Sequence, residues 1–315
     1  MGRLYVKDFQ PGDRVRTTLL VLSRRLVPFR DPTRGNFLHL SLADRTGTVQ
    51  GRVWDRAEEL YAMVSDEDLV DVQGVVEEYQ GSLQLIVEKL KKVPEEKVDP
   101  FDFVPSTEKD PEAMMAELDE IIGSLSNRHL LALLDGWFNA EPLRGQFMLA
   151  PAAKQIHHSY LGGLLEHTLE VVHLADALVG LYPSLDRDLL ITAAILHDVG
   201  KLREFKYRRA IDYTDRGRLI GHTVLGYELV MNRVRELEGF PSSLAMHLGH
   251  LILTHHGEMD YGAPIRPQTL EAAALHHADL TSGKVKQFAQ ILAGCADGER
   301  WTAYNRLLGR FLYKG

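Results

Sequence analysis

The stretch DRDLLITAAILHDVGKL, residues 186–202, decides how the second half of this chain folds. Its apolar positions recur at helical spacing, which predicts a mostly apolar helix that ends in His197-Asp198. Gly200 suits the C-terminal stop of such a helix. An ionised aspartate on an apolar helix is costly to bury unless a cation pairs with it. The pattern therefore indicates a metal-binding pair or, as the simpler alternative, a helix-end salt bridge between Asp198 and Lys201.

Two residues outside this stretch favour the metal. His167 precedes the pair in an apolar helical run, and Asp279 follows it in EAAALHHADLTSGKV, residues 271–285. Neutral imidazole and carboxylate together bind a borderline or hard divalent cation and leave coordination positions open. A lone buried histidine is more often a hydrogen-bonded core residue. The prediction of a metal centre therefore depends on the whole set and on its order, His, His-Asp, Asp.

Further histidines predict a second metal ion. His222 begins another helical pattern, and the adjacent His255 and His256 stand where an apolar helix meets a Gly/Pro loop. Lys201, three residues after Asp198, could lie beside the metals and bind a phosphate oxygen as a compact point charge. His276 could be a second-shell residue that orients a ligand through its other ring nitrogen.

The remaining histidines are assigned weaker roles. For one of the adjacent pair His157-His158 we expect substrate contact or an outer-sphere position, and His158 is the candidate. His173 lies six residues after His167 and therefore faces elsewhere on its helix, so it is interpreted as structural. His277 is expected to be peripheral.

The first part of the chain reads as β structure. Short alternating or β-branched runs separated by turns predict strands in VRTTLLVLSRRLV, NFLHLSLAD, GTVQGRVWD, LVDVQGVVEEY and SLQLIVEKLKKV. RAEELYAMVS, residues 56–65, predicts one interposed helix. Five strands with one helix fit an OB-fold barrel.

The chain therefore divides into a β part and an α part. We expect an OB-fold nucleic-acid-binding domain at 1–92 and a proline-rich, charged linker at 93–111. An all-α domain follows at 112–315, with its metal core at about 150–295. The fold class is thus a multidomain chain in which an N-terminal β-barrel is followed by a helical domain.

Composition limits the possible classes of function. A hydrophobic content of 45% and a charged content of 25% are ordinary for a soluble globular protein. The single Cys295 argues for a reducing, cytoplasmic setting. No apolar run approaches the roughly 18 residues of a membrane span, so no membrane partner is expected. Residues 1–54 hold ten Lys or Arg against four Asp, a local charge of +6 in a chain of −8, which favours polyanion binding.

An OB barrel grips single strands with basic and aromatic side chains. In the first 54 residues the candidate phosphate contacts are Arg24, Arg25, Arg30, Arg34 and Arg52, with Phe37 and Trp54 as stacking platforms. Arg45, Phe29 and Tyr79 are further candidates of the same kinds. The plainer alternative is that the aromatic residues fill the barrel core and the arginines form a solvated face.

The motifs resemble those of a known superfamily. His167, His197-Asp198 and Asp279 resemble the ligand pattern of HD-domain phosphohydrolases, over about residues 150–295. The phrases HHSYLGGLLEHTLEV, ILHDVGK, LTHHGEMDYGAP and LHHAD are similar to those of the YhaM-type 3′–5′ exoribonucleases. That family also carries an N-terminal OB domain, so the likeness extends over nearly the whole chain.

The resemblance implies a catalytic mechanism. It assigns a first metal to His167, His197, Asp198 and Asp279, and assigns a second metal or phosphate to Lys201, His222, His255 and His256. Two ions bridged by Asp198 would lower the pKa of a water molecule to roughly 7 for in-line attack on phosphorus, while Lys201 stabilises the charge that develops. Histidine-rich ligation favours Mn, Fe, Co, Ni or Zn over Mg, and the family implies manganese. The expected activity is 3′–5′ hydrolysis of single-stranded RNA, with single-stranded DNA as a further candidate substrate.

Two other classes of function stay open. One is a phosphohydrolase of nucleotides or cyclic dinucleotides, although a small substrate needs no strand-binding barrel. The cyclic-dinucleotide branch usually has His-His-Glu and then Gly-Tyr-Pro, whereas Gly257 follows the histidine pair here and the later triplet is Gly262-Ala263-Pro264. The other is a non-catalytic RNA-binding regulator, against which the complete ligand set argues.

Overall fold

The computed structural model describes residues 4–29, 31–79, 81–139, 142–154, 158–207, 209–296 and 298–315. The chain divides into two compact units. The first comprises Met1–Pro105 and Tyr207–Ala210, and the second comprises Ser106–Lys206 and Ile211–Gly315. The main boundary, between Pro105 and Ser106, falls inside the proline-rich stretch 93–111.

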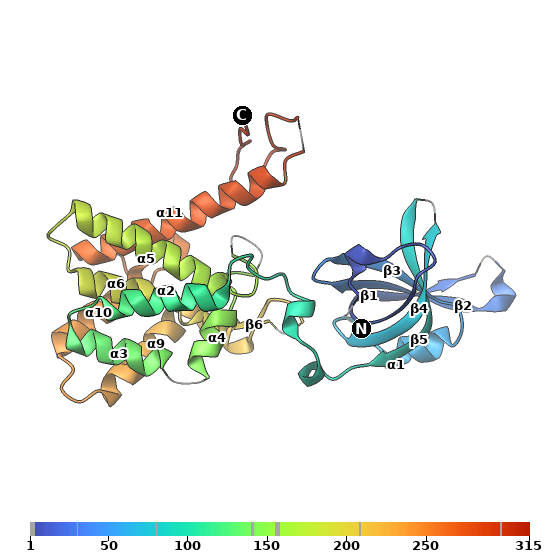
Figure 1. The fold of residues 1–315 in the computed structure, drawn as a ribbon, viewed down its shortest axis with the longest axis horizontal. Coiled ribbons are helices and arrows are strands. Elements are labelled where there is room, and N and C mark those ends of the chain that lie inside the picture. The colour runs from blue at the N-terminus through green and yellow to red at the C-terminus, as the bar shows by residue number, and fades with distance from the viewer. Residues whose placement is uncertain are drawn as a thin grey trace. The chain divides into compact units, whose positions relative to one another are not determined.

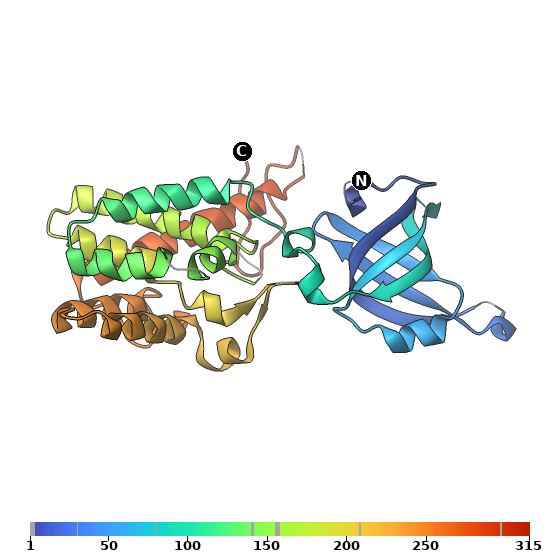
Figure 2. The same ribbon diagram turned by 60° about the horizontal axis from the view of Figure 1, so that its bottom comes forward.

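The first unit is a closed five-stranded barrel (Figures 1 and 2). Its strand order is β1-β2-β3-β5-β4, and β3 and β5 pair in parallel while the other neighbours are antiparallel. The elements are β1 (Arg14–Pro28), β2 (Asn36–Asp44), β3 (Gly47–Val53), α1 (Ala57–Met63), β4 (Leu69–Tyr79) and β5 (Ser82–Lys92). Short 3-10 helices lie at Val6–Asp8, Pro32–Arg34, Glu95–Lys97 and Pro100–Asp102. The predicted OB-type barrel with one interposed helix is confirmed.

The barrel closes because its strands alternate. Leu38, Leu40 and Leu42 of β2 are fully buried, whereas the residues between them point outward. Two irregularities bend the sheet, one in β1 between Val21 and Ser23 and one in β4 at Gly74. A Cβ at Gly74 would lie 2.1 Å from the Ile86 carbonyl oxygen, so only glycine permits this close approach of β4 and β5.

The second unit is helical and carries one two-stranded hairpin. Its elements are α2 (Pro111–Gly123), α3 (Arg128–Phe138), α4 (Leu143–Leu149), α5 (Gly163–Leu181), α6 (Arg187–Leu196), α7 (Lys201–Glu204), β6 (Phe205–Lys206), β7 (Asp212–Tyr213), α8 (Asp215–Ile220), α9 (His222–Glu236), α10 (Ser242–Thr254), a 3-10 helix at Met259–Tyr261, and α11 (Leu270–Ala293). Helix α6 packs against α5, α10 and α11 (Figure 1). Every side chain of α6 from Leu189 to Leu196 is buried, as expected for a central helix. None of the helices in the described ranges is long and apolar enough to cross a membrane.

The role predicted for Gly200 is wrong. Helix α6 ends at Leu196, before His197, and Gly200 has the right-handed φ of −60° rather than the left-handed conformation of a helix stop. A Cβ at Gly200 would lie 1.9 Å from the His222 carbonyl oxygen and 2.6 Å from the Gly226 amide nitrogen. Gly200 is therefore needed for close packing of the segment after Asp198 against α9.

Candidate metal centre and nucleic-acid surface

Three separate elements bring the first group of candidate ligands together. His167 lies on α5, His197 directly follows α6, and Asp279 lies on α11. The two histidine Nε2 atoms are 3.3 Å apart, and Asp279 Oδ1 is 3.1 Å from His167 Nε2 and 3.9 Å from His197 Nε2. One ligand atom from each residue lies within 4.8 Å of the others, which is compatible with a single shared cation.

A second group consists entirely of histidines. His222 begins α9, and His255 and His256 follow the end of α10. The Nε2 atoms of His222 and His256 are 2.9 Å apart. The three residues again place one ligand atom each within 4.8 Å of the others.

Asp198 stands between the two groups. Its Oδ2 atom is 3.3 Å from His197 Nε2 and 3.5 Å from His167 Nε2, on the first side. Its Oδ1 atom is 3.5 Å from His222 Nε2 and 3.7 Å from His255 Nε2, on the second side. One carboxylate can therefore contribute one oxygen to each group. Lys201 Nζ also contacts Oδ2, at 2.5 Å, so the salt bridge that the sequence offered as an alternative forms within the same cluster.

The Nδ1 atoms of these histidines make hydrogen bonds on the side of the ring away from Asp198. His197, His255 and His256 donate from Nδ1 to the backbone carbonyls of Ala194, Ile252 and Tyr261, at 2.7–2.8 Å. Since a carbonyl oxygen only accepts, each Nδ1 must carry a proton, and in the neutral ring Nε2 then has the lone pair. His222 Nδ1 lies 3.1 Å from Glu204 Oε1, and His167 Nδ1 lies 3.1 Å from Ser282 Oγ. This arrangement points the lone pairs toward Asp198.

The charges at the centre also suit metal binding. Burial lowers the pKa of His255 well below its usual value, and the nearby His256 lowers it further. Burial and His222 likewise lower the pKa of His256, so these histidines are neutral ligands at pH 7. Burial alone would raise the pKa of Asp198, but the charges of Lys201 and His197 outweigh it, and the carboxyl stays ionised.

The residues present fit divalent cations. His255 Nε2 is buried and makes no hydrogen bond, although it faces the Asp198 carboxylate from 3.7 Å. A buried imidazole nitrogen of this kind is costly unless something binds its lone pair. Imidazole and carboxylate donors on both sides of Asp198 match the ligand preferences of first-row transition metals.

A buried hydrogen-bond chain supports His167. Ser282 Oγ, which contacts His167 Nδ1, donates to Glu170 Oε2 at 2.8 Å. The same carboxylate oxygen lies 3.1 Å from Nε2 of His158, and His158 Nδ1 is 3.0 Å from the Tyr160 hydroxyl. His158 is fully buried, so of the two roles that the sequence suggested for it, the outer-sphere position suits this placement and substrate contact does not.

This series of hydrogen bonds ends at the carboxylate of Glu166, which accepts from the Tyr160 hydroxyl. Burial would raise the pKa of Glu166, but hydrogen bonds from Lys286, Thr107 and Tyr160 hold it at about 2. Sequence reasoning missed Glu166, Glu170, Ser282 and Glu204. The only signal for Glu170 was its position three residues after His167, on a neighbouring helix face.

His276 supports the loop after the histidine pair rather than a ligand ring. Its Nδ1 donates to the backbone carbonyl of His255 at 2.9 Å. Gly257 has a φ of +77°, and a Cβ there would lie 2.3 Å from the His276 ring. The glycine after the histidine pair is therefore required by this close approach. His277 is exposed, as expected for a peripheral residue.

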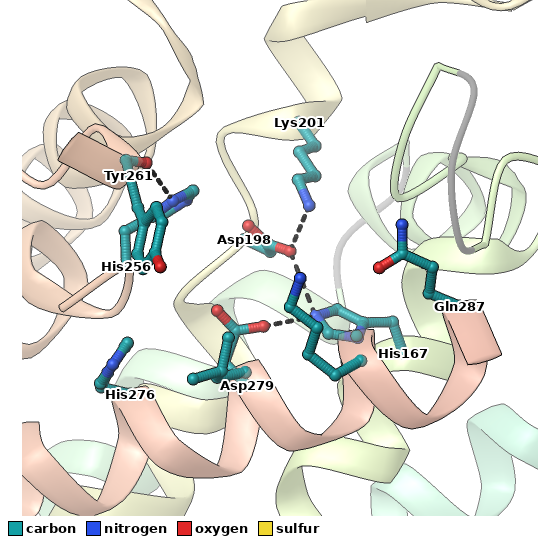
Figure 3. Close-up of a pocket in the computed structure, with 11 residues that line it drawn as sticks. His167, Asp198, Lys201, His256, Tyr261, His276, Asp279 and Gln287 are labelled. Carbon is teal, nitrogen blue, oxygen red and sulfur yellow. Dashed lines mark hydrogen bonds and ion pairs between the residues drawn. The ribbon is translucent and has the colours of Figure 1, made fainter. Parts of the chain in front are cut away.

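An open cavity of about 230 Å³ leads to the first group of ligands (Figure 3). Its lining includes His167, Asp198 and Asp279 at the metal side and Lys201 on one wall. The rest of the lining was not expected from the sequence, apart from His256 and His276, and consists of Tyr261, Leu280, Gly283, Lys284 and Gln287. A second cavity lies beside His222 and is lined by Lys154, Lys201, Glu204, Phe205 and Tyr213.

On the barrel, two rows of side chains cross β1, β2 and β3. Arg25, His39 and Arg52 are paired across the three strands, and Arg25 Nε donates to His39 Nδ1 at 2.8 Å. Two positions away, Phe37 packs on Trp54 and Phe29 with ring centroids 5.0 Å and 5.4 Å apart. A basic row thus lies beside an aromatic row, which is the combination that single strands require.

The other barrel candidates differ in placement. The Arg34 guanidinium lies 4.5 Å from the Phe29 ring centre, and Trp54 is 41% exposed, so both belong to this surface. Arg24 pairs in register with the inward-facing Leu40 and stacks on Tyr61 of α1 instead. Arg24 therefore lies apart from the row of Arg25, His39 and Arg52, because adjacent strand residues point to opposite faces. Arg30 lies outside the described residues.

Comparison with known proteins identifies the family. The HD domain matches residues 164–283, and the OB-fold nucleic acid binding domain matches residues 20–93. The 3′-5′ exoribonuclease YhaM of Bacillus subtilis (strain 168) is 32% identical over 279 residues, which cover 88% of this chain and 88% of that protein. The chain belongs to the YhaM family.

The YhaM of Shouchella clausii (strain KSM-K16) is similar to the same degree, at 32% identity over 281 residues and 86% of its length. Among solved structures, the HD domain of the L. monocytogenes phosphodiesterase PgpH is similar to this chain at 19% sequence identity and a TM-score of 0.32. The matched region covers 49% of this chain and 80% of the PgpH chain. Membership of the YhaM family confirms the resemblance inferred from the motifs. The presence of an HD domain implies dependence on a divalent metal ion.

Proposed function

We propose that this YhaM-family chain is a 3′–5′ exoribonuclease that removes nucleotides from single-stranded RNA with two divalent metal ions. The observation that carries the proposal is the pair of ligand groups on either side of Asp198, each with its lone pairs directed inward. The activity named for the Bacillus and Shouchella relatives supports the same reaction. Single-stranded DNA is a further candidate substrate.

In this proposal the first ion is held by His167, His197 and Asp279, and the second by His222, His255 and His256. Asp198, whose two oxygens face the two groups, would be available to both ions. Manganese is the proposed metal. Bound divalent cations supply Lewis acidity, which activates water toward phosphorus at neutral pH and stabilises negative charge on phosphoryl oxygens.

The chain's own residues then position the strand. Lys201 Nζ, at the wall of the cavity, contacts a non-bridging phosphate oxygen while it keeps Asp198 ionised through its charge. The barrel rows bind the strand upstream of the cleaved bond, with Arg25 and Arg52 on phosphates and Phe37 and Trp54 against bases. The proposed reaction needs no serine or cysteine nucleophile.

The test uses 5′-labelled RNA and DNA of the same sequence, with Mn²⁺ or with EDTA. We expect a metal-dependent ladder that shortens from the 3′ end, and a loss of about 10³-fold or more in Asp198→Ala, because that carboxylate serves both ions. Asp176→Ala is the matched control, since this exposed carboxylate pairs only with Arg187 on the helix surface. Bound metal measured by mass spectrometry gives a readout independent of activity. Intact RNA with the wild-type protein would overturn the proposal.

A further inference from the structure

Helix α11 carries a buried side-chain amide, that of Gln287, which is not among the candidate metal ligands. Gln287 is 8% exposed and lines the same cavity as Asp279, and its side chain has no hydrogen-bond partner among the described residues. Figure 3 shows the amide at the cavity wall across from His256. The carboxamide faces the cavity and can both donate and accept, so it can pair with a ligand there that does both.

The spacing along α11 relates this amide to the metal centre. Asp279, Gly283 and Gln287 follow one another at intervals of four, so they share a helix face. The eight residues from Asp279 to Gln287 extend about 12 Å along the axis. Gly283 has no side chain, so the cavity floor between the two polar groups is bare backbone. A ligand can therefore lie along this face from the metal site to the amide.

A lysine lies along the same path. Lys284 is exposed, lines the cavity, and forms no ion pair with any described residue. It precedes Gln287 by three residues, which places the two side chains on neighbouring positions of the helix surface. The cavity thus offers a free cation beside an amide. At about 230 Å³ it is smaller than the 300–1,000 Å³ typical of drug-sized ligand pockets, so it suits one nucleotide rather than a longer strand.

We propose that Gln287 binds the 2′,3′-diol of the terminal ribose and that Lys284 contacts the phosphate of the same nucleotide. The inference rests on the proposed exoribonuclease function. An enzyme that shortens a strand step by step must accept every base, whereas a glutamine on a base edge would select among bases. The vicinal diol is shared by all four ribonucleotides and occurs only at the 3′ end of RNA. The carboxamide oxygen accepts from one hydroxyl while its NH₂ donates to the other.

The proposal predicts two selectivities from one contact. Internal nucleotides lack a free 3′-hydroxyl, and DNA lacks the 2′-hydroxyl. Either absence leaves part of the Gln287 amide unpaired in the bound state, which lowers the rate by about tenfold for one lost hydrogen bond.

The test compares three RNA strands of identical sequence that end in a ribonucleotide, a 2′-deoxynucleotide or a 3′-deoxynucleotide. Release of the first nucleotide by the wild-type protein should have a kcat/KM about tenfold higher for the diol end. Gln287→Met keeps the volume but removes the hydrogen bonds, so it should treat the three ends alike. Gln290→Met, on an exposed position of the same helix, should keep the discrimination.

Binding supplies a second readout. Calorimetric titration with adenosine 5′-monophosphate and its 2′-deoxy form should show the same preference in wild type and none in Gln287→Met. Thermal unfolding of Gln287→Met tests whether this variant is folded. Gln287→Leu serves as a second variant without the amide and is measured in the same way. Lys284→Ala should weaken all strands equally and reduce the slope of log K against log salt by about 0.7.

The outcomes separate the two proposals. A wild-type protein that shortens RNA without preference for the diol end, or a Gln287→Met variant that retains the preference, would overturn this inference alone. A wild-type protein that leaves the diol-ended RNA intact in Mn²⁺ would overturn the exoribonuclease proposal and this inference with it.

Discussion

The two sides of Asp198 resemble each other in ligand number and differ in charge. The first side has the carboxylate of Asp279 in addition to two imidazoles, and a buried chain of polar residues supports His167. The second side has three imidazoles, held by the carbonyls of Ile252 and Tyr261 and by Glu204. A divalent cation is attracted more strongly where two carboxylates face it than where one does. Under the proposed function, we therefore expect the first side to bind its ion more tightly than the second side.

The largest effect is expected from removing this difference in charge. Asp279→Asn should lower the affinity for the first ion by more than about 100-fold. Loss of a direct ligand costs more affinity than loss of a group that supports a ligand, which costs about 10–100-fold. His256→Gln should release only the second ion. Metal content after gel filtration, measured by mass spectrometry, distinguishes the two variants. If both lose the same ion or lose both equally, the two sides are not independent sites.

A smaller effect is expected from the support of His167. Ser282→Ala removes the oxygen that contacts Nδ1, so the ring loses its fixed tautomer and orientation. Metal affinity of the first side should fall about 10–100-fold while the second side keeps its ion. Thr281→Ala, on the neighbouring exposed position, is the control. Unchanged affinity in Ser282→Ala would mean that packing alone orients His167.

The smallest expected effect is on the free energy of unfolding, through Asp212 in strand β7. Hydrogen bonds from Lys154 and from the Tyr213 amide hold the pKa of Asp212 at about 2, against an ordinary value of 3.8. A lowered folded-state pKa stabilises the protein above pH 4, and this contribution disappears as the pH falls toward 2. Asp212→Asn should cost about 1 kcal/mol at pH 7 after allowance for solvent screening. Urea unfolding at pH 7 and pH 2.5 measures it. An equal cost at both pH values would exclude the ionised pair as its source.

Sequence patterns predicted the strands and main helices well, because period-2 and period-3.6 repeats are local properties. The candidate ligand residues were also accessible, because His197-Asp198 and His255-His256 are residue pairs that can be recognised locally in the sequence. Position relative to distant elements was not accessible. Ser282 contacts His167 across 115 residues of sequence. Gln287 stands out only in the structure, where no residue in the described ranges pairs with its amide.

The placements of Gly200 and Arg24 were inaccessible from the sequence for the same physical reason. Gly200 has the composition of a helix stop, but its role depends on how closely α9 approaches, which no local pattern encodes. Arg24 lies in a basic run with Arg25, yet the two side chains leave opposite faces of β1, in a strand whose register shifts between Val21 and Ser23. Strand register and helix proximity are tertiary properties, and a single sequence does not reveal them.

Under the two proposals, helix α11 would also hold the metal centre and the ribose contact at a constant separation. Asp279 at the cutting point and Gln287 at the end of the cavity belong to one continuous helix of 24 residues. An α-helix is stiff over two turns, so the separation of these residues cannot change without breaking backbone hydrogen bonds. Under the proposed function, the constant separation of Asp279 and Gln287 would place the terminal ribose at a constant distance from the metal centre. Each cut would then remove the same length of strand, independently of how the barrel binds the rest.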